Sequence, residues 1–587
     1  NGGGTHTRIG TDADGQSDEA EGNVISGNVT GILDRGVSTL VAGNYVGTDQ
    51  SGTGSLTNVM QGIFVDAINT TIGGLLPAQQ NVISGNGIGI NVSGQIQGTG
   101  TRILGNLIGT DTTGGVAIPN TASGVNVAAG ATGTVIGGGD AGAANVISGN
   151  HLHGVFVGGG AAGTVVAGNL LGTDFSGTLP LGNEGSGVQL DSTAAATTVG
   201  GIGQGNVIAG NGVGITIENL QTAATVAVVG NAIGTDRSGT IDLGNAAAGV
   251  LAADDATVGG LATGQANTIA FNDVGVHVVG EDATATIRGN RIFGNDNLGI
   301  DLSGSIGLPD GVTANDPLDA DGGPNGLQNF PVIDSISATG STTVSGTFAS
   351  TANSVFTLDF YASDLPAGNG FGEDGRYLGS ALVNTDGSGA ALFNAGGLAA
   401  VLDGELITAT ATDAGGNTSE FSAGRVASVG TPPTIVQDSL LITVIEGDDE
   451  AATFGIPTLV VDEGQTLQLT GDFFDADPTV QVIVNWGDGE RSNAQIIRDE
   501  SFASTHVYDD DDPSNSPSNQ YGIFVTAVDA DGSGSSLINL TVNNVDPIVK
   551  TADTSIDRNL IDQGESVVIS GSFADPGKRD QHRLLVD

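Results

Sequence analysis

The chain has 587 residues, too many for one ordinary domain, so we expect several domains or one long repeat architecture. It carries 65 acidic and 15 basic residues, a formal net charge of −50, which excludes the basic surface of a nucleic-acid-binding protein and the basic patch that anionic membranes attract. It contains no cysteine, which excludes disulfide bonds, thiolate metal sites and cysteine nucleophiles.

Glycine is unusually frequent, with 99 residues, but the chain is also 38% hydrophobic, which a disordered chain normally is not. Glycines at regular intervals between short apolar runs indicate short strands joined by tight turns. No apolar run approaches transmembrane length, so we expect no membrane span in this sequence. Because the chain begins at Asn1 within a repeat, we expect a fragment whose signal peptide lies upstream.

Two motifs recur along the first half of the chain. Asn-Val-Ile-Ser-Gly-Asn and its variants begin at residues 23, 81, 145, 206 and 267, which are 58 to 64 residues apart. Gly-Asn-x-Φ-Gly-Thr-Asp, where Φ is aliphatic, begins at residues 43, 105, 168 and 230, which are 62 or 63 residues apart. We interpret Ile9-Gly10-Thr11-Asp12 as a truncated copy of the second motif.

Short alternating segments between these motifs, such as residues 89–92 and 154–157, predict strands with one aliphatic face. A single coil of such strands cannot bury that face, but stacked coils can. Two coils in each unit of roughly 61 residues predict about ten coils and a rod on the order of 50 Å long. Asparagines at fixed positions are expected to stack at equivalent turns, with a ligand role as the alternative: Asn28, Asn86, Asn150 and Asn211.

The pattern NVISGN…GIxV…GNxIGTDxxGT…GVxV…TVIGG resembles the right-handed parallel β-helix repeat family, of the pectate-lyase-like superfamily, in very large secreted and surface proteins of bacteria. The resemblance covers residues 1–306 and implies the fold without implying one function. The predicted fold class is therefore all-β, a right-handed parallel β-helix followed by β-sandwiches.

An acidic, glycine-rich connector is expected at residues 307–327 and a β-sandwich at residues 328–430. Its strands are predicted at residues 343–348, 356–362, 377–383, 390–393 and 406–412. The segments LQNFPVI and ATATDAGGNTSEFS resemble the immunoglobulin-like domain that often follows such β-helices.

A second sandwich is predicted at residues 431–549. Its WGDG segment, residues 486–489, resembles the hallmark of polycystic-kidney-disease-type (PKD) domains, and Trp486 is expected to be a core anchor. Asp562-Gln563-Gly564 and Gly571-Ser572-Phe573 match segments 100 residues earlier, so residues 550–587 are expected to begin a second such domain that is truncated here.

Carboxylates cluster in three loops where we expect Ca²⁺, a cation that prefers oxygen ligands. The predicted ligands are Asp310, Asp316, Asp319, Asp321, Asp509, Asp511, Asp529 and Asp531. The alternative is a solvated polar linker. The repeated Gly-Thr-Asp segments predict Asx-turns, with a calcium role as the alternative: Asp49, Asp111, Asp174 and Asp236.

The histidines His151 and His153 would face one side of an extended strand and could bind a metal, although a surface turn is favoured. The β-helix shows neither the paired carboxylates of a glycoside hydrolase nor a pectinase motif, so we predict no catalytic residue.

The favoured function is an extracellular structural or adhesive protein, a rod-like part of a large bacterial surface or filament protein. Its expected partners are copies of itself, other surface proteins or an extracellular polysaccharide, and its open coil ends are expected to favour homotypic assembly. The alternative is a secreted protein that binds or degrades polysaccharide.

Overall fold

The computed structural model describes residues 5–575 except 97, 219–225, 304–310, 339–340, 364–374, 428–432, 446–451, 455–458, 476–479, 499, 510–516, 529–532, 557–565 and 567. The described part is built from strands, with short helices at α1 (Asp18–Glu21), η1 (Pro77–Gln79), η2 (Pro324–Leu327) and η3 (Gln437–Ser439). The predicted all-β fold class is confirmed. No described helix has the length and hydropathy needed to cross a membrane.

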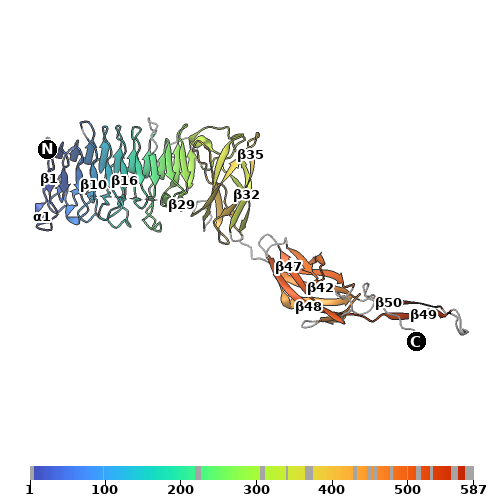
Figure 1. Cartoon of the computed structure of the whole chain (residues 1–587). Coiled ribbons are helices and arrows are strands. Elements are labelled where there is room, and N and C mark those ends of the chain that lie inside the picture. Colours follow the sequence, from blue (N-terminus) through green and yellow to red (C-terminus); the bar gives the residue numbers. More distant parts are fainter. Residues whose placement is uncertain are drawn as a thin grey trace. The chain divides into compact units, whose positions relative to one another are not determined.

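Three parallel ten-stranded sheets form the β-helix, and each coil contributes one strand to each sheet (Figure 1). The first sheet contains β1 (Arg8–Gly10), β4 (Leu40–Ala42), β7 (Thr71–Gly73), β10 (Arg102–Leu104), β13 (Val135–Gly137), β16 (Val165–Ala167), β19 (Thr198–Gly200), β22 (Val226–Val229), β25 (Ala256–Gly259) and β28 (Ala285–Arg288). The second contains β2 (Val24–Ile25), β5 (Tyr45–Val46), β8 (Val82–Ile83), β11 (Leu107–Ile108), β14 (Val146–Ile147), β17 (Leu170–Leu171), β20 (Val207–Ile208), β23 (Ala232–Ile233), β26 (Thr268–Ala270) and β29 (Arg291–Phe293). The third contains β3 (Thr30–Asp34), β6 (Gln61–Val65), β9 (Ile88–Ser93), β12 (Val125–Ala128), β15 (Val155–Val157), β18 (Ser186–Leu190), β21 (Val213–Ile217), β24 (Ala248–Ala252), β27 (Val274–Val279) and β30 (Ile300–Ser303).

Inward-facing aliphatic side chains stack in register from coil to coil. In the first sheet Ile103 pairs with Ile72 on one side and with Ile136 on the other, and all three are fully buried. One continuous core cluster runs from Ile32 to Leu302, which explains why the coils must stack to be stable.

The register corrects one motif assignment. Ile9 and Gly10 pair with Val41 and Ala42, and Val41 pairs in turn with Ile72 in the first sheet. Ile9 and Gly10 therefore lie in β1, a strand of the first sheet, and the segment is not a copy of the Gly-Thr-Asp motif, which follows strands of the second sheet. Ile-Gly closes first-sheet strands such as β7, and the same two letters occur where second-sheet strands such as β11 end and the loop glycine follows, so the letters alone did not separate them.

Two asparagine ladders flank the second sheet, one residue per coil. In each ladder every side-chain Nδ2 donates to the Oδ1 of the next asparagine, over 2.8 to 3.2 Å. One ladder is Asn23, Asn44, Asn81, Asn106, Asn145, Asn169, Asn206, Asn231, Asn267 and Asn290. The other is Asn28, Asn58, Asn86, Asn120, Asn150, Asn183, Asn211, Asn245, Asn272 and Asn295. The structural role predicted for the repeated asparagines is confirmed.

The four Gly-Thr-Asp loops, residues 49–55, 111–117, 174–180 and 236–242, are hairpins closed by an antiparallel bridge. In the second loop, Asp111 Oδ1 accepts hydrogen bonds from the Thr113 hydroxyl (2.7 Å) and from the backbone N–H of Val116 (3.2 Å). In the fourth, Asp236 accepts equivalent bonds from Ser238 and Ile241. The Asx-turn interpretation is confirmed, because each carboxylate organises its own loop.

These loops cover the outer face of the second sheet, where Val82, Leu107 and Val146 form a separate buried cluster. Gly114 shows why the loop requires glycine. Its φ is +67°, and a Cβ there would lie 2.9 Å from Phe175 Cβ and 3.2 Å from Leu107 Cδ2.

A β-sandwich closes the last coil of the β-helix. N–H groups of β28, and that of Gly289 directly after it, donate to side chains of the sandwich and its connector. Ala285 N donates to Asn325 Oδ1 (2.6 Å), Ile287 N to Thr418 Oγ1 (3.0 Å) and Gly289 N to Tyr361 OH (3.2 Å). The strand edge predicted to be open is therefore covered at this end.

Charge and apolar packing reinforce the same junction. Arg288 on β28 donates to both carboxylate oxygens of Asp359, at 2.5 and 2.8 Å, and Asp359 is fully buried. This pair raises the pKa of Arg288. Tyr361 and Phe421 of the sandwich belong to the β-helix core cluster. The β-helix and this sandwich accordingly form one compact unit, Asn1–Ile336 with Ser341–Ala427.

The sandwich has two antiparallel sheets. One contains β31 (Val332–Ala338), β32 (Thr342–Ala349) and β35 (Ala390–Leu398). The other contains β34 (Arg376–Asn384), β33 (Val355–Ser363), β36 (Leu406–Thr412) and β37 (Arg425–Val426). The five strands predicted here are confirmed.

The second compact unit comprises Ser337–Gly340 and Ser428–Asp587. One sheet contains β40 (Ala452–Phe454), β39 (Leu441–Ile445), β42 (Thr466–Phe474), β46 (Ser501–Val507) and β45 (Gln495–Arg498), with β38 (Thr434–Ile435) also on β42. The other contains β41 (Leu459–Asp462), β48 (Ser533–Asn543), β47 (Ser518–Val528), β43 (Gln481–Asn485) and β44 (Arg491–Asn493). Trp486 is 1% exposed in the core between them, as predicted.

A separate ribbon of β49 (Ile548–Ile556) and β50 (Ile569–Ala574) repeats the strand pairing of this sandwich. Ile548 pairs with Ala574 as Thr434 pairs with Phe474. Ala574 lies 100 residues after Phe474, which is the offset between the repeated sequence segments. Ile556 likewise pairs with Ile569 as Ile442 pairs with Leu469.

A column of buried threonines in the β-helix leads to a first prediction. The hydroxyls of Thr101, Thr134, Thr164 and Thr197 are fully buried and have no hydrogen-bond partner among the described residues. Thr70 in the same column donates to Asp34 Oδ2 at 2.7 Å. Thr134→Val should therefore stabilise the fold by about 1 kcal/mol, and Thr70→Val should destabilise it by about 2 kcal/mol. Urea unfolding followed by far-ultraviolet circular dichroism measures both, and equal signs for the two variants would contradict the prediction.

The fourth loop gives a second prediction. Burial opposes ionisation of Asp236, but the Ser238 hydroxyl and the Ile241 and Thr240 N–H groups outweigh burial and lower the pKa of this carboxyl. A lowered folded-state pKa stabilises the fold above the ordinary pKa and loses that contribution as pH falls below about 4. Ser238→Ala removes the hydroxyl that lowers the pKa of Asp236, so the melting temperature of this variant should fall less steeply than that of the wild type below about pH 4. Ser238→Thr keeps the hydroxyl and should retain the wild-type pH profile. Identical pH profiles for wild type and Ser238→Ala would refute this account.

Candidate metal centre

Three of the predicted calcium ligands lie together in the connector between the β-helix and its sandwich. One carboxylate oxygen each from Asp316, Asp319 and Asp321 lies within 4.8 Å of the others. Asp319 has left-handed backbone geometry, with φ 53°, as does Leu318 before it, with φ 65°. This tight turn brings three carboxylates within six residues to one point.

Asn329 fastens this turn to the sandwich. Its Oδ1 accepts from Asp316 N (3.0 Å), and its Nδ2 donates to Asp316 O (2.8 Å) and to Ala349 O at the end of β32 (3.0 Å). Its backbone N–H donates to Asp319 Oδ1 (3.0 Å), and Ser350 Oγ donates to Asp319 Oδ2 (2.7 Å). The carboxylates are therefore held in place by the sandwich.

The electrostatics of the cluster favour a cation. Burial, followed by the charges of Asp321 and Asp316, raises the pKa of Asp319 despite its hydrogen bonds. Burial and the charge of Asp316 also raise the pKa of Asp321. A divalent cation would remove this repulsion, and carboxylate oxygens are the ligands that Ca²⁺ takes.

The other predicted ligands do not join this cluster in the part of the chain that is described. Asp310, Asp511, Asp529 and Asp531 lie outside the described residues, and Asp509 is exposed in the second unit. The site therefore rests on three of the eight predicted carboxylates.

A second acidic cluster, which the sequence analysis did not select, lies in the first coil. Oxygens of Asp12, Asp18 and Glu21 lie within 4.8 Å of one another. Chain groups already engage them, because Arg8 forms an ion pair with Asp12, Asp12 N donates to Glu21, and Thr11 Oγ1 donates to Asp18. The density of acidic residues from Asp12 to Glu21 was the signal that could have identified this cluster.

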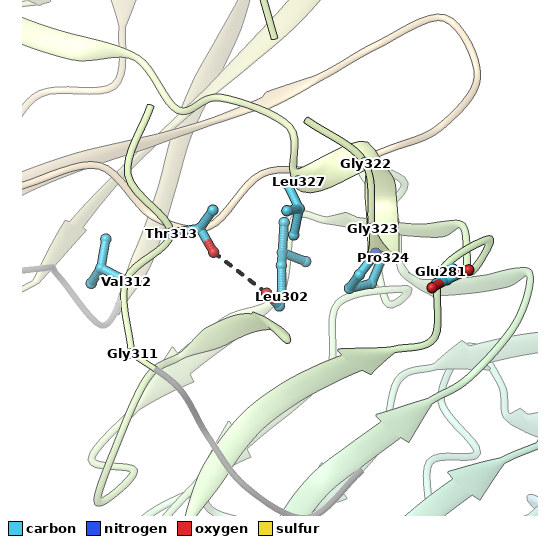
Figure 2. Close-up of a pocket in the computed structure, with 9 residues that line it drawn as sticks. All are labelled: Glu281, Leu302, Gly311, Val312, Thr313, Gly322, Gly323, Pro324 and Leu327. Carbon is cyan, nitrogen blue, oxygen red and sulfur yellow. Dashed lines mark hydrogen bonds between the residues drawn. The ribbon is translucent and has the colours of Figure 1, made fainter. Parts of the chain in front are cut away.

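A cavity of about 440 Å³ lies beside the connector, against the last strand of the β-helix (Figure 2). It is lined by Glu281, Leu302, Gly311, Val312, Thr313, Gly322, Gly323, Pro324 and Leu327. Thr313 Oγ1 donates to Leu302 O at 3.4 Å, as Figure 2 shows. Buried Glu420 accepts hydrogen bonds from the backbone N–H groups of both residues. Among the described residues that line the cavity, most side chains are apolar and Glu281 supplies the one carboxylate.

The two histidines considered as metal ligands have separate partners. His151 Nδ1 lies 2.8 Å from Glu184 Oε1, whereas His153 Nδ1 accepts from Ser186 N at 3.1 Å. Burial lowers the pKa of His153. Both precede β15 and lie outside any strand; His151 lies in an exposed bend, as the surface-turn interpretation predicted, whereas His153 is partly buried.

The chain matches no protein-family model and no curated protein. Among solved structures, titin domains I67–I69 are 14% identical, with a TM-score of 0.20, over 38% of this chain and 69% of that one. The fibronectin(III)-like modules of Clostridium thermocellum CbhA are 16% identical, with a TM-score of 0.20, over 36% of this chain and 93% of that one. The ICAM-5 D1–D4 fragment is 12% identical, with a TM-score of 0.17, over 42% of this chain and 75% of that one.

Proposed function

We propose that this chain is a rigid structural and adhesive part of an extracellular surface protein. Its β-helix acts as a spacer, its first sandwich is immunoglobulin-like and terminates the spacer, and its second unit is a PKD-type module. The WGDG turn at residues 486–489 supports the PKD assignment, and the strand pairing of β49 with β50 supports the interpretation of residues 550–587 as the beginning of another such module.

The observation that carries this proposal is the use of the repeated polar residues. The asparagine of each ladder bonds to the next coil, and each Gly-Thr-Asp carboxylate bonds within its own loop. Residues repeated in every coil or every second coil thus serve the length and rigidity of the stack. A protein selected for these properties is a spacer.

Gold labelling of intact producer cells with an antibody to residues 5–303 tests the location. Label on the cell envelope or on fibres between cells is the expected result. Label confined to the culture medium, with bare cells, would refute the surface role and favour the released polysaccharide-active alternative, for which uronate-containing and neutral polysaccharides would then be screened.

We also propose that Ca²⁺ binds Asp316, Asp319 and Asp321 and stiffens the junction between the spacer and its sandwich. The cluster is bonded to the sandwich through Asn329 and Ser350, so a bound cation would tie the connector to the end of β32. The function of the site is then mechanical, since it holds two domains in one unit.

Without Ca²⁺, the pKa values of Asp319 and Asp321 are raised in the folded state. Protonation of these two carboxyls therefore contributes to the free energy of unfolding at low pH, and that contribution is lost as pH rises through their folded-state pKa values. Ca²⁺ should therefore raise the melting temperature of the first unit more at pH 7 than at pH 4. Asp319→Asn should weaken calcium affinity at least tenfold, as measured by isothermal titration calorimetry, and should reduce this gain in melting temperature. The matched control is Asp18→Asn in the other acidic cluster, and a loss of affinity in that variant alone would contradict the assignment.

A further inference from the structure

The tips of the Gly-Thr-Asp loops present a row of exposed apolar side chains. Val116, Leu179 and Ile241 each stand five residues after the loop aspartate, and each donates its backbone N–H to that aspartate. Their exposed fractions are 60, 62 and 38%. The three side chains therefore occupy the same position in successive loops.

The row has a regular spacing. The loops follow β5, β11, β17 and β23, which are every second strand of the second sheet. Two strand spacings amount to about 10 Å. Phe175, which is 61% exposed, adds to the row, and its N–H donates to Gly114 O at 3.0 Å, so the second and third loops touch.

The loops carry few charges in a chain whose net charge is −50. Apart from the four loop aspartates, the loops at residues 49–55, 111–117, 174–180 and 236–242 carry two charged side chains, Arg237 and Asp242, and Asp242 is exposed beside Ile241. Of the loop aspartates, Asp111 and Asp236 are 6 and 8% exposed, whereas Asp49 and Asp174 are partly exposed. Two copies of a chain with this net charge repel each other, and the small number of charges on the loops weakens that repulsion where the loops meet.

We propose that a second copy of this chain packs side by side against the loop-tip row, with the two β-helices antiparallel. A two-fold axis between the second and third loops sets the second loop of each copy against the third loop of the other, and the first loop against the fourth. The loops meet in register because the two copies have the same loop spacing. Val116 then faces Leu179 of the partner subunit. Arg237 of the fourth loop faces Asp49 of the partner subunit in the first loop, which supplies charge complementarity.

This inference goes beyond the spacer role and differs from assembly through the coil ends. At the described C-terminal end of the β-helix, sandwich side chains occupy the strand edge, so lateral contact is the route left open there. A spacer that stayed monomeric would still satisfy the proposed function, so the two ideas fail separately.

Sedimentation velocity over a wide concentration range tests the contact. The wild-type chain should dimerise, and the combined Val116→Asp, Leu179→Asp and Ile241→Asp variant should associate about 100-fold more weakly. The matched control places three aspartates on turns between the first and second sheets, by Leu76→Asp, Ile202→Asp and Leu261→Asp at positions that are also exposed. Circular dichroism checks that both variants fold. A wild-type chain that remains monomeric, or equal weakening by both triple variants, would overturn the proposal.

Cysteine cross-linking tests the antiparallel arrangement, and the natural absence of cysteine makes each introduced thiol unique. A mixture of Val116→Cys and Leu179→Cys chains should form disulfide dimers faster than either variant alone. Parallel packing would reverse this order, and slow cross-linking in all three samples would count against contact at the row.

Discussion

The structure depends on the hydrogen bond between one asparagine amide and the next, repeated along two ladders. Stacked coils would bring like polar groups together at every turn, and a buried polar group without a partner is costly. The amide solves this problem because it carries both a donor and an acceptor, so each Asn can accept from the preceding coil and donate to the following one. A carboxylate could not form such a chain, since it only accepts. The aliphatic core supplies the driving force for stacking, but the ladders fix the register of the coils.

Much of this architecture was readable in the sequence, because a repeat displays the same environment many times. Asn86, Asn150 and Asn211 recur at one position of the repeat. Because the same residue type is needed in every coil of the stack, its repetition in the sequence indicates a structural role. The core position of Trp486 was readable for a different reason, since one large aromatic beside turn glycines has few places to pack. The false assignment of Ile9-Gly10-Thr11-Asp12 arose because Ile-Gly occurs at the end of strands in both the first and the second sheet, and only the hydrogen-bonded neighbours distinguish the two.

The junction was beyond the sequence because its parts are far apart in the chain. Nothing near Arg288 indicates that Asp359 will meet it 71 residues later, or that Asn325 and Thr418 will occupy neighbouring positions on one strand edge. The acidic connector was identified from its composition, and the structure brings three of its carboxylates together. Their anchor, Asn329, could not be foreseen, since its importance lies in contacts to Asp316, Asp319 and Ala349 together.

The way the last coil ends has an evolutionary consequence. The sandwich recognises the edge of β28 through Asn325, Thr418 and Tyr361, and these contacts are indifferent to how many coils precede them. Each coil likewise recognises its neighbours through the same ladder bonds wherever it stands in the stack. Duplication or deletion of a whole two-coil unit would thus leave both kinds of interface intact, and the gene could change the reach of the protein in steps of about 10 Å. Because each of the first four two-coil units carries one loop, duplication or deletion of one of them would also add or remove one loop tip and keep the spacing of the row.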